Sequence, residues 1–462
     1  MSLLLAVAFL GVLCLVLEIL NIKKTIVPVV VIALLGLFGL TVNDLLTHGS
    51  FLDIVSLPGM LVFNNYAKAF SALFVLLTAL ILCLIPFCTR ERTGHYTDYT
   101  AIILFLLSGA IAMVSFSNLS MFFIGLEVLS ISLYLLPASN VKSRRSNEAG
   151  MKYFLMGSFA SSLILFGVAL IYGATGTFDI SKIIEVSHST TFPVWYSLGL
   201  TLILVGMLFK VSAAPFHFWA PDVYQGAPTI ITTVMSTLVK VAAVATLYKL
   251  MDILVPTISG SSRIIIVVIS ILTMTIGNIT AIKQTNIKRL LAYSGISHAG
   301  FMLMALLYLH QNSEILLYYT AAYSLAGVAA FSVVIAVCHA KGKQDMEMFS
   351  GLGKTNPLMA VVLTAAMFSM AGIPIFSGFM AKFFLFNEML SIGETGLVVV
   401  GVLNSIVSVF YYFRIVNLMF TKEPDTSHVI KYPIEVAVVA VIAIALNILL
   451  GIYPSIITSL TI

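Results

Sequence analysis

Apolar stretches of about 20 residues, separated by short polar segments, recur along almost the whole chain. A helix of this length rises about 30 Å, which is the thickness of the hydrocarbon layer of a bilayer. The pattern therefore predicts transmembrane helices. We place fourteen of them, at 2–20, 27–46, 67–88, 99–116, 119–137, 152–173, 195–219, 229–250, 262–282, 289–309, 315–339, 357–391, 396–419 and 433–458.

Composition supports a membrane protein. Of the 462 residues, 60% are hydrophobic and 9% are charged, whereas soluble domains carry about 25% charged residues. Because there are too few polar side chains to form a surface that faces water, the protein must be surrounded by lipid. The net charge of +5 does not indicate nucleic-acid binding, because the basic residues form short clusters between apolar stretches. We expect an all-α polytopic membrane protein.

Two of the predicted helices contain residues that break helices. The helix at 195–219 contains Pro215, and the long stretch at 357–391 contains Gly372 and Pro374. Proline removes a backbone donor and clashes with the preceding turn, so both helices should be broken. Each is the fourth helix of a group of five.

The chain is thus expected to divide into four parts. A three-helix segment at 1–98 precedes one five-helix group at 99–258 and a second at 259–420, and a final helix occupies 421–462. Because five is odd, the second group would start from the opposite side of the membrane. Two inverted repeats with broken helices are typical of transporters.

Basic residues are distributed unequally between the connecting segments. Segments after odd-numbered helices carry 15 Lys and Arg, and those after even-numbered helices carry 4. The positive-inside rule places the first set in the cytoplasm. With fourteen helices, both chain ends are expected on the periplasmic side of a bacterial inner membrane.

A few charged residues fall inside the predicted helices. Glu127, Lys210 and Lys240 lie near the middle of theirs, where a charge costs at least about 2.5–3.5 kcal/mol. A structural ion pair is one explanation, but one glutamate cannot neutralise several lysines. We interpret the three as proton-transfer groups, because a carboxylate that moves relative to a buried lysine makes it take up or release a proton. We expect Glu127 near Lys210 without a permanent bridge.

Three further residues are weaker candidates. Lys382 follows Pro374 by eight residues, and Lys152 opens a helix beside a basic segment, where snorkelling explains it equally well. His298 lies mid-helix and is either a satisfied core residue or a relay group. The four cysteines lack the spacing of metal ligands, so we expect no metal or cofactor in this chain.

The stretch PFHFWAPDVYQGAPT, which begins at Pro215, closely resembles the N-type branch of the antiporter-like membrane subunits of proton-translocating NADH–quinone oxidoreductase, respiratory complex I. The stretches GLEVLSISLYLLP, LAYSGISHAGF and GIPIFSGFMAKF match the same family in the same order, so the resemblance covers essentially the whole chain. The sequence departs from the family at Gly295 and Ser297, where serine and alanine are common.

The resemblance implies both an architecture and roles. It implies fourteen helices with inverted repeats, and NADH, FMN, iron–sulfur clusters and quinone on partner subunits of the enzyme, next to adjacent membrane-arm subunits. By position, it makes Glu127 the coupling glutamate, Lys210 its pumping lysine, Lys240 the connecting lysine and Lys382 the lysine towards the exit. It also places Lys152 and His298 at relay positions.

Two other functions stay open. The chain could be a subunit of a multisubunit cation/proton antiporter, whose members look similar, or a structural membrane subunit whose buried charges only hold helices together. Neighbouring genes would separate the pump from the antiporter. Replacing Lys210 by alanine would separate both from a scaffold, because a scaffold would lose assembly.

Overall fold

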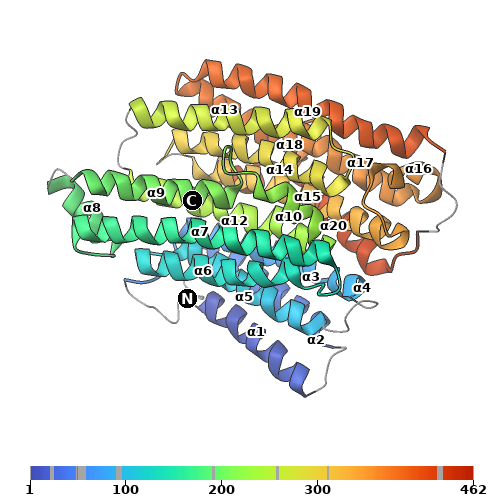
Figure 1. Ribbon diagram of the computed structural model, residues 1–462, viewed down its shortest axis with the longest axis horizontal. Coiled ribbons are helices and arrows are strands. Elements are labelled where there is room, and N and C mark those ends of the chain that lie inside the picture. Colours follow the sequence, from blue (N-terminus) through green and yellow to red (C-terminus); the bar gives the residue numbers. More distant parts are fainter. Residues whose placement is uncertain are drawn as a thin grey trace.

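The structure is a computed structural model that describes residues 2–20, 25–47, 49, 59–89, 96–189, 193–255, 260–309, 312–423 and 430–460. Most of these residues form helices that run side by side across one elongated bundle (Figure 1). Within the described residues, thirteen helices are long and apolar enough to cross a membrane. The broken pair α17–α18 supplies the fourteenth predicted crossing, which confirms the all-α polytopic fold.

The N-terminal segment contains three crossing helices and one short helix. These are α1 (Ser2–Ile19), α2 (Ile26–Leu46), α3 (Asn65–Leu82) and α4 (Ile85–Thr89). The next three crossings are α5 (Tyr96–Ser115), α6 (Leu119–Leu135) and α7 (Arg144–Thr175). The fourth is the broken pair α9 (Val194–Val211) and α10 (Trp219–Gly226). The fifth is a continuous helix built from α11 (Thr229–Val234), a π-helical turn (Met235–Val239) and α12 (Lys240–Leu254). The short α8 (Ile180–Ser189) links α7 to α9.

The second half of the chain repeats this order. Its crossings are α13 (Gly260–Ile282), α14 (Ile287–Leu303), α15 (Ser313–Lys341), α17 (Pro357–Ala371) with α18 (Ser377–Ser391), α19 (Thr395–Thr421) and the final α20 (Ile434–Ile452). The short helices α16 (Leu352–Thr355) and α21 (Ser455–Thr458) lie at helix ends.

The core of the bundle is formed by α15 and the helix Thr229–Leu254, whose most apolar 18 residues are fully buried. In outer helices such as α1, α2 and α13, only about a third or less of the most apolar 18 residues is buried, and many large apolar side chains are exposed. Because lipid tails are as apolar as these side chains, this exposure does not oppose folding in a membrane.

The first turns of α6 and α14 are built in the same way. Asn118 caps α6 by accepting from the N–H of Ser120, and Asn286 caps α14 by accepting from those of Lys288 and Arg289. Each asparagine also pairs with the segment after the next helix, through the bridges Asn118–Asp179 and Asn286–Asp345. The hydrogen bonds beside each bridge also match. In the first group, Leu119 N–H donates to Phe178 O and Ile180 N–H donates to Ser117 O. In the second group, Ile287 N–H donates to Gln344 O and Met346 N–H donates to Thr285 O.

Two glycines bring the first two helices of each group into the same close contact. A Cβ added to Gly109 would lie 2.6 Å from the backbone nitrogen of Leu129, and one added to Gly277 would lie 2.6 Å from that of Ser297. The same sequence offset separates the members of each pair. This correspondence supports the predicted five-helix repeats.

Both predicted helix breaks are present, and both begin before the proline. α9 ends at Val211, and Ser212 adopts a left-handed conformation with φ 65°. α17 ends at Ala371, and Gly372 does the same with φ 90°. In each case the N–H of the left-handed residue donates back to two carbonyls of the preceding turn, as in a helix C-cap. The prediction of two broken helices is confirmed.

The two chain ends lie towards the same end of the bundle, on the left in Figure 1. The opposite end holds the start of α7, the segment α10 and the end of α15. This arrangement agrees with an even number of crossings.

Candidate functional site

The break in α9 places Lys210 inside the bundle, against α6. Lys210 lies in the last turn of α9, is buried, and donates from Nζ to Ser130 Oγ at 2.7 Å. Its Nζ also lies 5.7 Å from the centre of the Tyr134 ring. Ser130 follows Glu127 by three residues on α6, so both face the same side of that helix. The structure thus brings Glu127 and Lys210 to one place, with Ser130 between them.

Glu127 is close enough to interact electrostatically with Lys210, yet the two do not form an ion pair. Among the described residues, no carboxylate oxygen lies within 4.0 Å of Lys210 Nζ. Glu127 Oε1 is buried, and among the residues that the structure describes it has no hydrogen-bond partner. A carboxylate without a fixed hydrogen bond therefore lies near a lysine that bonds a neutral hydroxyl, an arrangement in which movement of the carboxylate would change the proton affinity of the lysine.

Lys240 begins α12, directly after the π-helical turn Met235–Val239. It is buried, and its Nζ donates to the backbone carbonyl of Gly295 on α14 at 2.8 Å. A Cβ on Gly295 would lie 3.1 Å from that Nζ and 2.8 Å from the hydroxyl of Tyr323. The missing side chain therefore leaves room for Lys240. π-helical turns occur frequently at functional sites.

His298 lies one turn after Gly295 on α14 and is bonded on both ring nitrogens. Nδ1 lies 2.9 Å from the Tyr319 hydroxyl and Nε2 lies 3.3 Å from that of Tyr412. Tyr412 also forms a hydrogen bond with Ser294. His298 is within electrostatic reach of both Lys240 and Lys382, so the two lysines lie near the same histidine.

Lys382 is the second lysine near His298. It reaches back from α18 and donates to Ala371 O at 3.0 Å and Met370 O at 3.2 Å, the last carbonyls of α17. A small cavity joins this region to His298, and it is lined by His298, Tyr319, Ala322, Tyr323, Ser369, Met370, Gly378 and Ala381. Lys240, His298 and Lys382 therefore form one buried group.

Lys152 lies apart from these residues. Its side chain is 41% exposed and pairs with Glu148 at 2.7 Å and with Asp222 at 3.2 Å. The structure therefore places Lys152 in an ion-pair cluster at the end of the bundle where α7 begins.

Two further lysines, Lys249 and Lys288, are buried at the ends of neighbouring helices. Lys249 lies within α12 and donates to Val114 O and Phe116 O, at 2.7 and 2.8 Å. Lys288 lies in the first turn of α14 and donates to Gln225 O at 3.1 Å and to Ala227 O at 2.5 Å. Each donates to carbonyls at the end of a helix, so the buried ammonium group has hydrogen-bond acceptors there.

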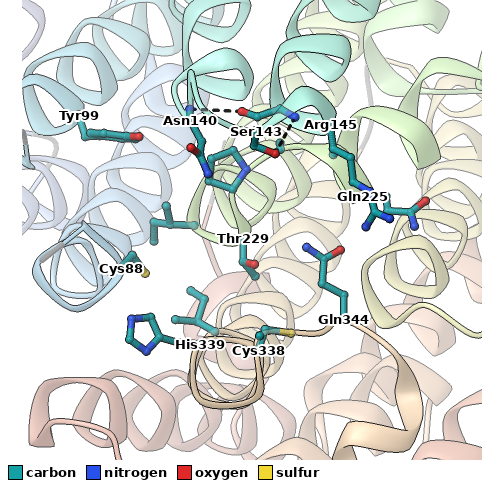
Figure 2. Close-up of a pocket in the computed structure, with 17 residues that line it drawn as sticks. Cys88, Tyr99, Asn140, Ser143, Arg145, Gln225, Thr229, Cys338, His339 and Gln344 are labelled. Carbon is teal, nitrogen blue, oxygen red and sulfur yellow. Dashed lines mark hydrogen bonds between the residues drawn. The ribbon is translucent and has the colours of Figure 1, made fainter. Parts of the chain in front are cut away.

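A polar cavity of about 270 Å³ opens at the same end of the bundle (Figure 2). At about 30 Å³ per water it has room for several water molecules. The polar ends of Asn140, Gln225, Thr229 and Gln344 surround it, with Arg145 beside Gln225. From Thr229, a row of hydroxyl side chains continues along the helix towards Lys240, namely Thr232, Thr233, Ser236 and Thr237.

Residues 116–408 match the family described as NADH:quinone oxidoreductase/Mrp antiporter, TM. The chain belongs to this family. Glu127, Lys210, Lys240, His298 and Lys382 all lie in the matched region. The resemblance inferred from the motifs is therefore confirmed.

Members of the family and related structures match the whole length of the chain. NADH-quinone oxidoreductase subunit N of Flavobacterium johnsoniae is 50% identical over 100% of both chains. A chain of respiratory complex I from Thermus thermophilus with bound aureothin is 28% identical, with a TM-score of 0.84 and coverage of 99% of this chain and 98% of that one. A chain of the Mrp complex from a Dietzia species is 23% identical, with a TM-score of 0.86 and coverage of 99% and 95%, and shows the fold alone.

Proposed function

We propose that this chain is the N-type proton-translocating subunit in the membrane arm of an NADH–quinone oxidoreductase. The observation that supports it most is the set of partners of Lys210, Lys240 and Lys382, the buried lysines that lie within electrostatic reach of Glu127 or His298. Lys210 donates to a hydroxyl, and Lys240 and Lys382 donate to backbone carbonyls. A permanent ion pair would hold each amine in its charged form, whereas neutral acceptors can bond either form of the amine. Such lysines can pass protons on.

The residues suggest a route. Protons enter from the 270 Å³ cavity and follow the hydroxyl row to Lys240. They then pass by way of His298, with the hydroxyls of Tyr319 and Tyr412, to Lys382. Movement of Glu127 towards Lys210, or away from it, determines whether Lys210 holds a proton. In this scheme Lys152 acts at the entrance, and Pro215 and Pro374 maintain the two helix breaks, of which the second frees the carbonyls that accept from Lys382.

The proposal includes partners and a location. NADH, FMN, iron–sulfur clusters and quinone belong to partner subunits, and the redox reaction there drives Glu127. The exposed apolar faces of the outer helices contact adjacent membrane-arm subunits and lipid. The chain lies in a bacterial inner membrane with both ends on the periplasmic side.

The test is substitution of Glu127 and Lys210 within the whole complex. Glu127→Ala and Lys210→Ala should each leave the complex assembled and oxidising NADH while lowering proton transport, measured by quenching of a pH-sensitive dye in membrane vesicles. Glu127→Asp should keep part of the activity, because the charge survives with a shorter reach. Lys354→Ala is the matched control, since Lys354 pairs with Glu423 on the exposed surface. Wild-type transport in Lys210→Ala, or failure of that variant to assemble, would contradict the proposal.

An antiporter subunit is the second candidate, because the fold is shared with the Mrp complex. It predicts transport without NADH and dependence on a second cation. Proton transport that requires NADH and is unaffected by sodium would exclude it.

A further inference from the structure

The second half of the broken helix, α10, is held by cations from both repeats. Asp222 on α10 lies with Oδ2 3.2 Å from Lys152 Nζ on α7, which belongs to the first group of helices. Its Oδ1 lies 2.6 Å from Arg289 Nη1 on α14, which belongs to the second group. One carboxylate therefore joins the two groups.

Further bonds attach the first turn of α14 to the end of α10. Arg289 Nη1 also donates to Gln225 Oε1 at 3.1 Å. Beside it, the fully buried Lys288 donates to the carbonyls of Gln225 and Ala227. A single exposed ion pair contributes little to stability, but here the pair lies beside a buried cation that bonds the same segment.

Asp222 bonds two cations, Arg289 and Lys152, and both favour its charged form.

The residues that Asp222 joins lead directly to the buried lysines. α10 follows the break that places Lys210, and α14 runs from Arg289 to Gly295 and His298 in fewer than three turns. A helix is stiff over this length, so a movement of its first turn carries Gly295 and His298 with it. Through Asp222, displacement of the broken helix reaches the acceptor of Lys240.

We propose that Asp222 is a positioning residue that couples the broken helix of the first repeat to α14, so that the sites of Lys210 and Lys240 change together. This inference rests on the proposed proton-transport function. Its consequence is that loss of the Asp222 charge uncouples the two sites while every buried lysine remains in place.

The test compares Asp222→Asn with Glu148→Gln in the whole complex. Glu148 is the other carboxylate bonded to Lys152 and lies one turn before it on the same helix, α7, so it is a matched control. Spin labels at Phe218→Cys and Lys283→Cys, on a background without the four native cysteines, report the distance between the start of α10 and the short connection from α13 to α14. Both positions are exposed. Proton transport and NADH oxidation are measured on the same samples.

Asp222→Asn should broaden the distance distribution and lower the protons transported per NADH, to a level between wild type and Lys240→Ala. Glu148→Gln should change neither quantity, and Asp222→Glu should restore part of both. An unchanged distance in Asp222→Asn, or wild-type transport despite a broadened distance, would overturn the inference. The spin-label distances do not depend on the proposed function, which fails separately if Lys210→Ala transports protons at the wild-type rate.

Discussion

At Lys210, a hydroxyl takes the place that a carboxylate would occupy in a structural ion pair. Ser130→Ala removes the acceptor 2.7 Å from Lys210 Nζ, and a buried donor without a partner costs about 1–3 kcal/mol. The ammonium should then move towards Glu127. We expect intact assembly and NADH oxidation, with proton transport lowered less than in Lys210→Ala.

Ser162→Ala is the control for this experiment. Ser162 is exposed on α7 and donates to the backbone carbonyl of Ser158, so its loss should not change transport. If Ser130→Ala transports protons as well as Ser162→Ala does, Ser130 is not the partner on which Lys210 depends.

Two native cysteines allow the cavity to be tested as a proton entrance. Cys88 and Cys338 both line it. A charged methanethiosulfonate reagent that modifies them should place a bulky ion in the cavity and slow proton transport. The measurement is transport by vesicles with the cavity side outward, before and after treatment.

Loss of sensitivity should depend on these two thiols alone. The double variant Cys88→Ala, Cys338→Ala should resist the reagent, whereas Cys14→Ala, Cys83→Ala should remain sensitive, because Cys14 and Cys83 do not line the cavity. Equal inhibition of both variants would place the entrance elsewhere.

The charged residues of the site were predictable from sequence, but their partners were not. A lysine or glutamate in an apolar stretch is conspicuous, because its insertion is costly. Ser130 is not, since serine in a membrane helix commonly bonds its own backbone. The carbonyl of Gly295 and the hydroxyls of Tyr319 and Tyr412 likewise have no sequence signature.

At the level of helices, the close contact between α5 and α6 and its counterpart between α13 and α14 can be tested together. Gly109→Ala and Gly277→Ala each place a Cβ 2.6 Å from a backbone nitrogen. Backbone cannot move aside as a flexible side chain does, and overpacking of this kind costs about 1–3 kcal/mol. Both variants should lower the yield and the melting temperature of the assembled complex.

Gly36→Ala provides the comparison. Gly36 lies in α2, and no atom of the described residues lies within 4 Å of the position that a Cβ would take there. Alanine at this position should leave stability unchanged or raise it by about 0.5–1 kcal/mol. If Gly109→Ala is as stable as Gly36→Ala, the two helices are not held at the distance that the structure shows.

Sequence predicted the crossings well and their irregularities only in part. Pro215 and Pro374 located the broken helices, but the helices end earlier, at Val211 and Ala371, because Ser212 and Gly372 adopt left-handed conformations. A tertiary constraint selects that conformation at Ser212, a residue type that rarely adopts it. The π-helical turn before Lys240 was not predicted, because a shift in hydrogen-bond register leaves no mark on hydrophobic periodicity.

For the whole molecule, helix order alone suggested two five-helix repeats, and matching contacts now support them. The capping asparagines Asn118 and Asn286 and the paired glycines recur at one offset. The candidate proton-transfer residues do not recur in this way. At the position of Glu127 the second group has Gly295, and at that of Ser130 it has His298. The two halves of one scaffold therefore carry different candidate groups, which suits the proposed path from one repeat to the other.

The orientation of the bundle decides the direction of that path. The end that holds Arg144, Arg145 and the cavity follows odd-numbered helices, and the 15-to-4 excess of basic residues there predicts that it faces the cytoplasm. Val141→Cys, 77% exposed in the connection before α7, should react with a membrane-impermeant maleimide only when the cytoplasmic face is accessible. Val194→Cys, 82% exposed at the opposite end of the bundle, should react only from the periplasmic face. Intact spheroplasts and inverted vesicles present these faces separately. Reversed labelling would mean that the cavity faces the periplasm, so that protons leave through it. Protons would then have to enter from the side nearer Lys382.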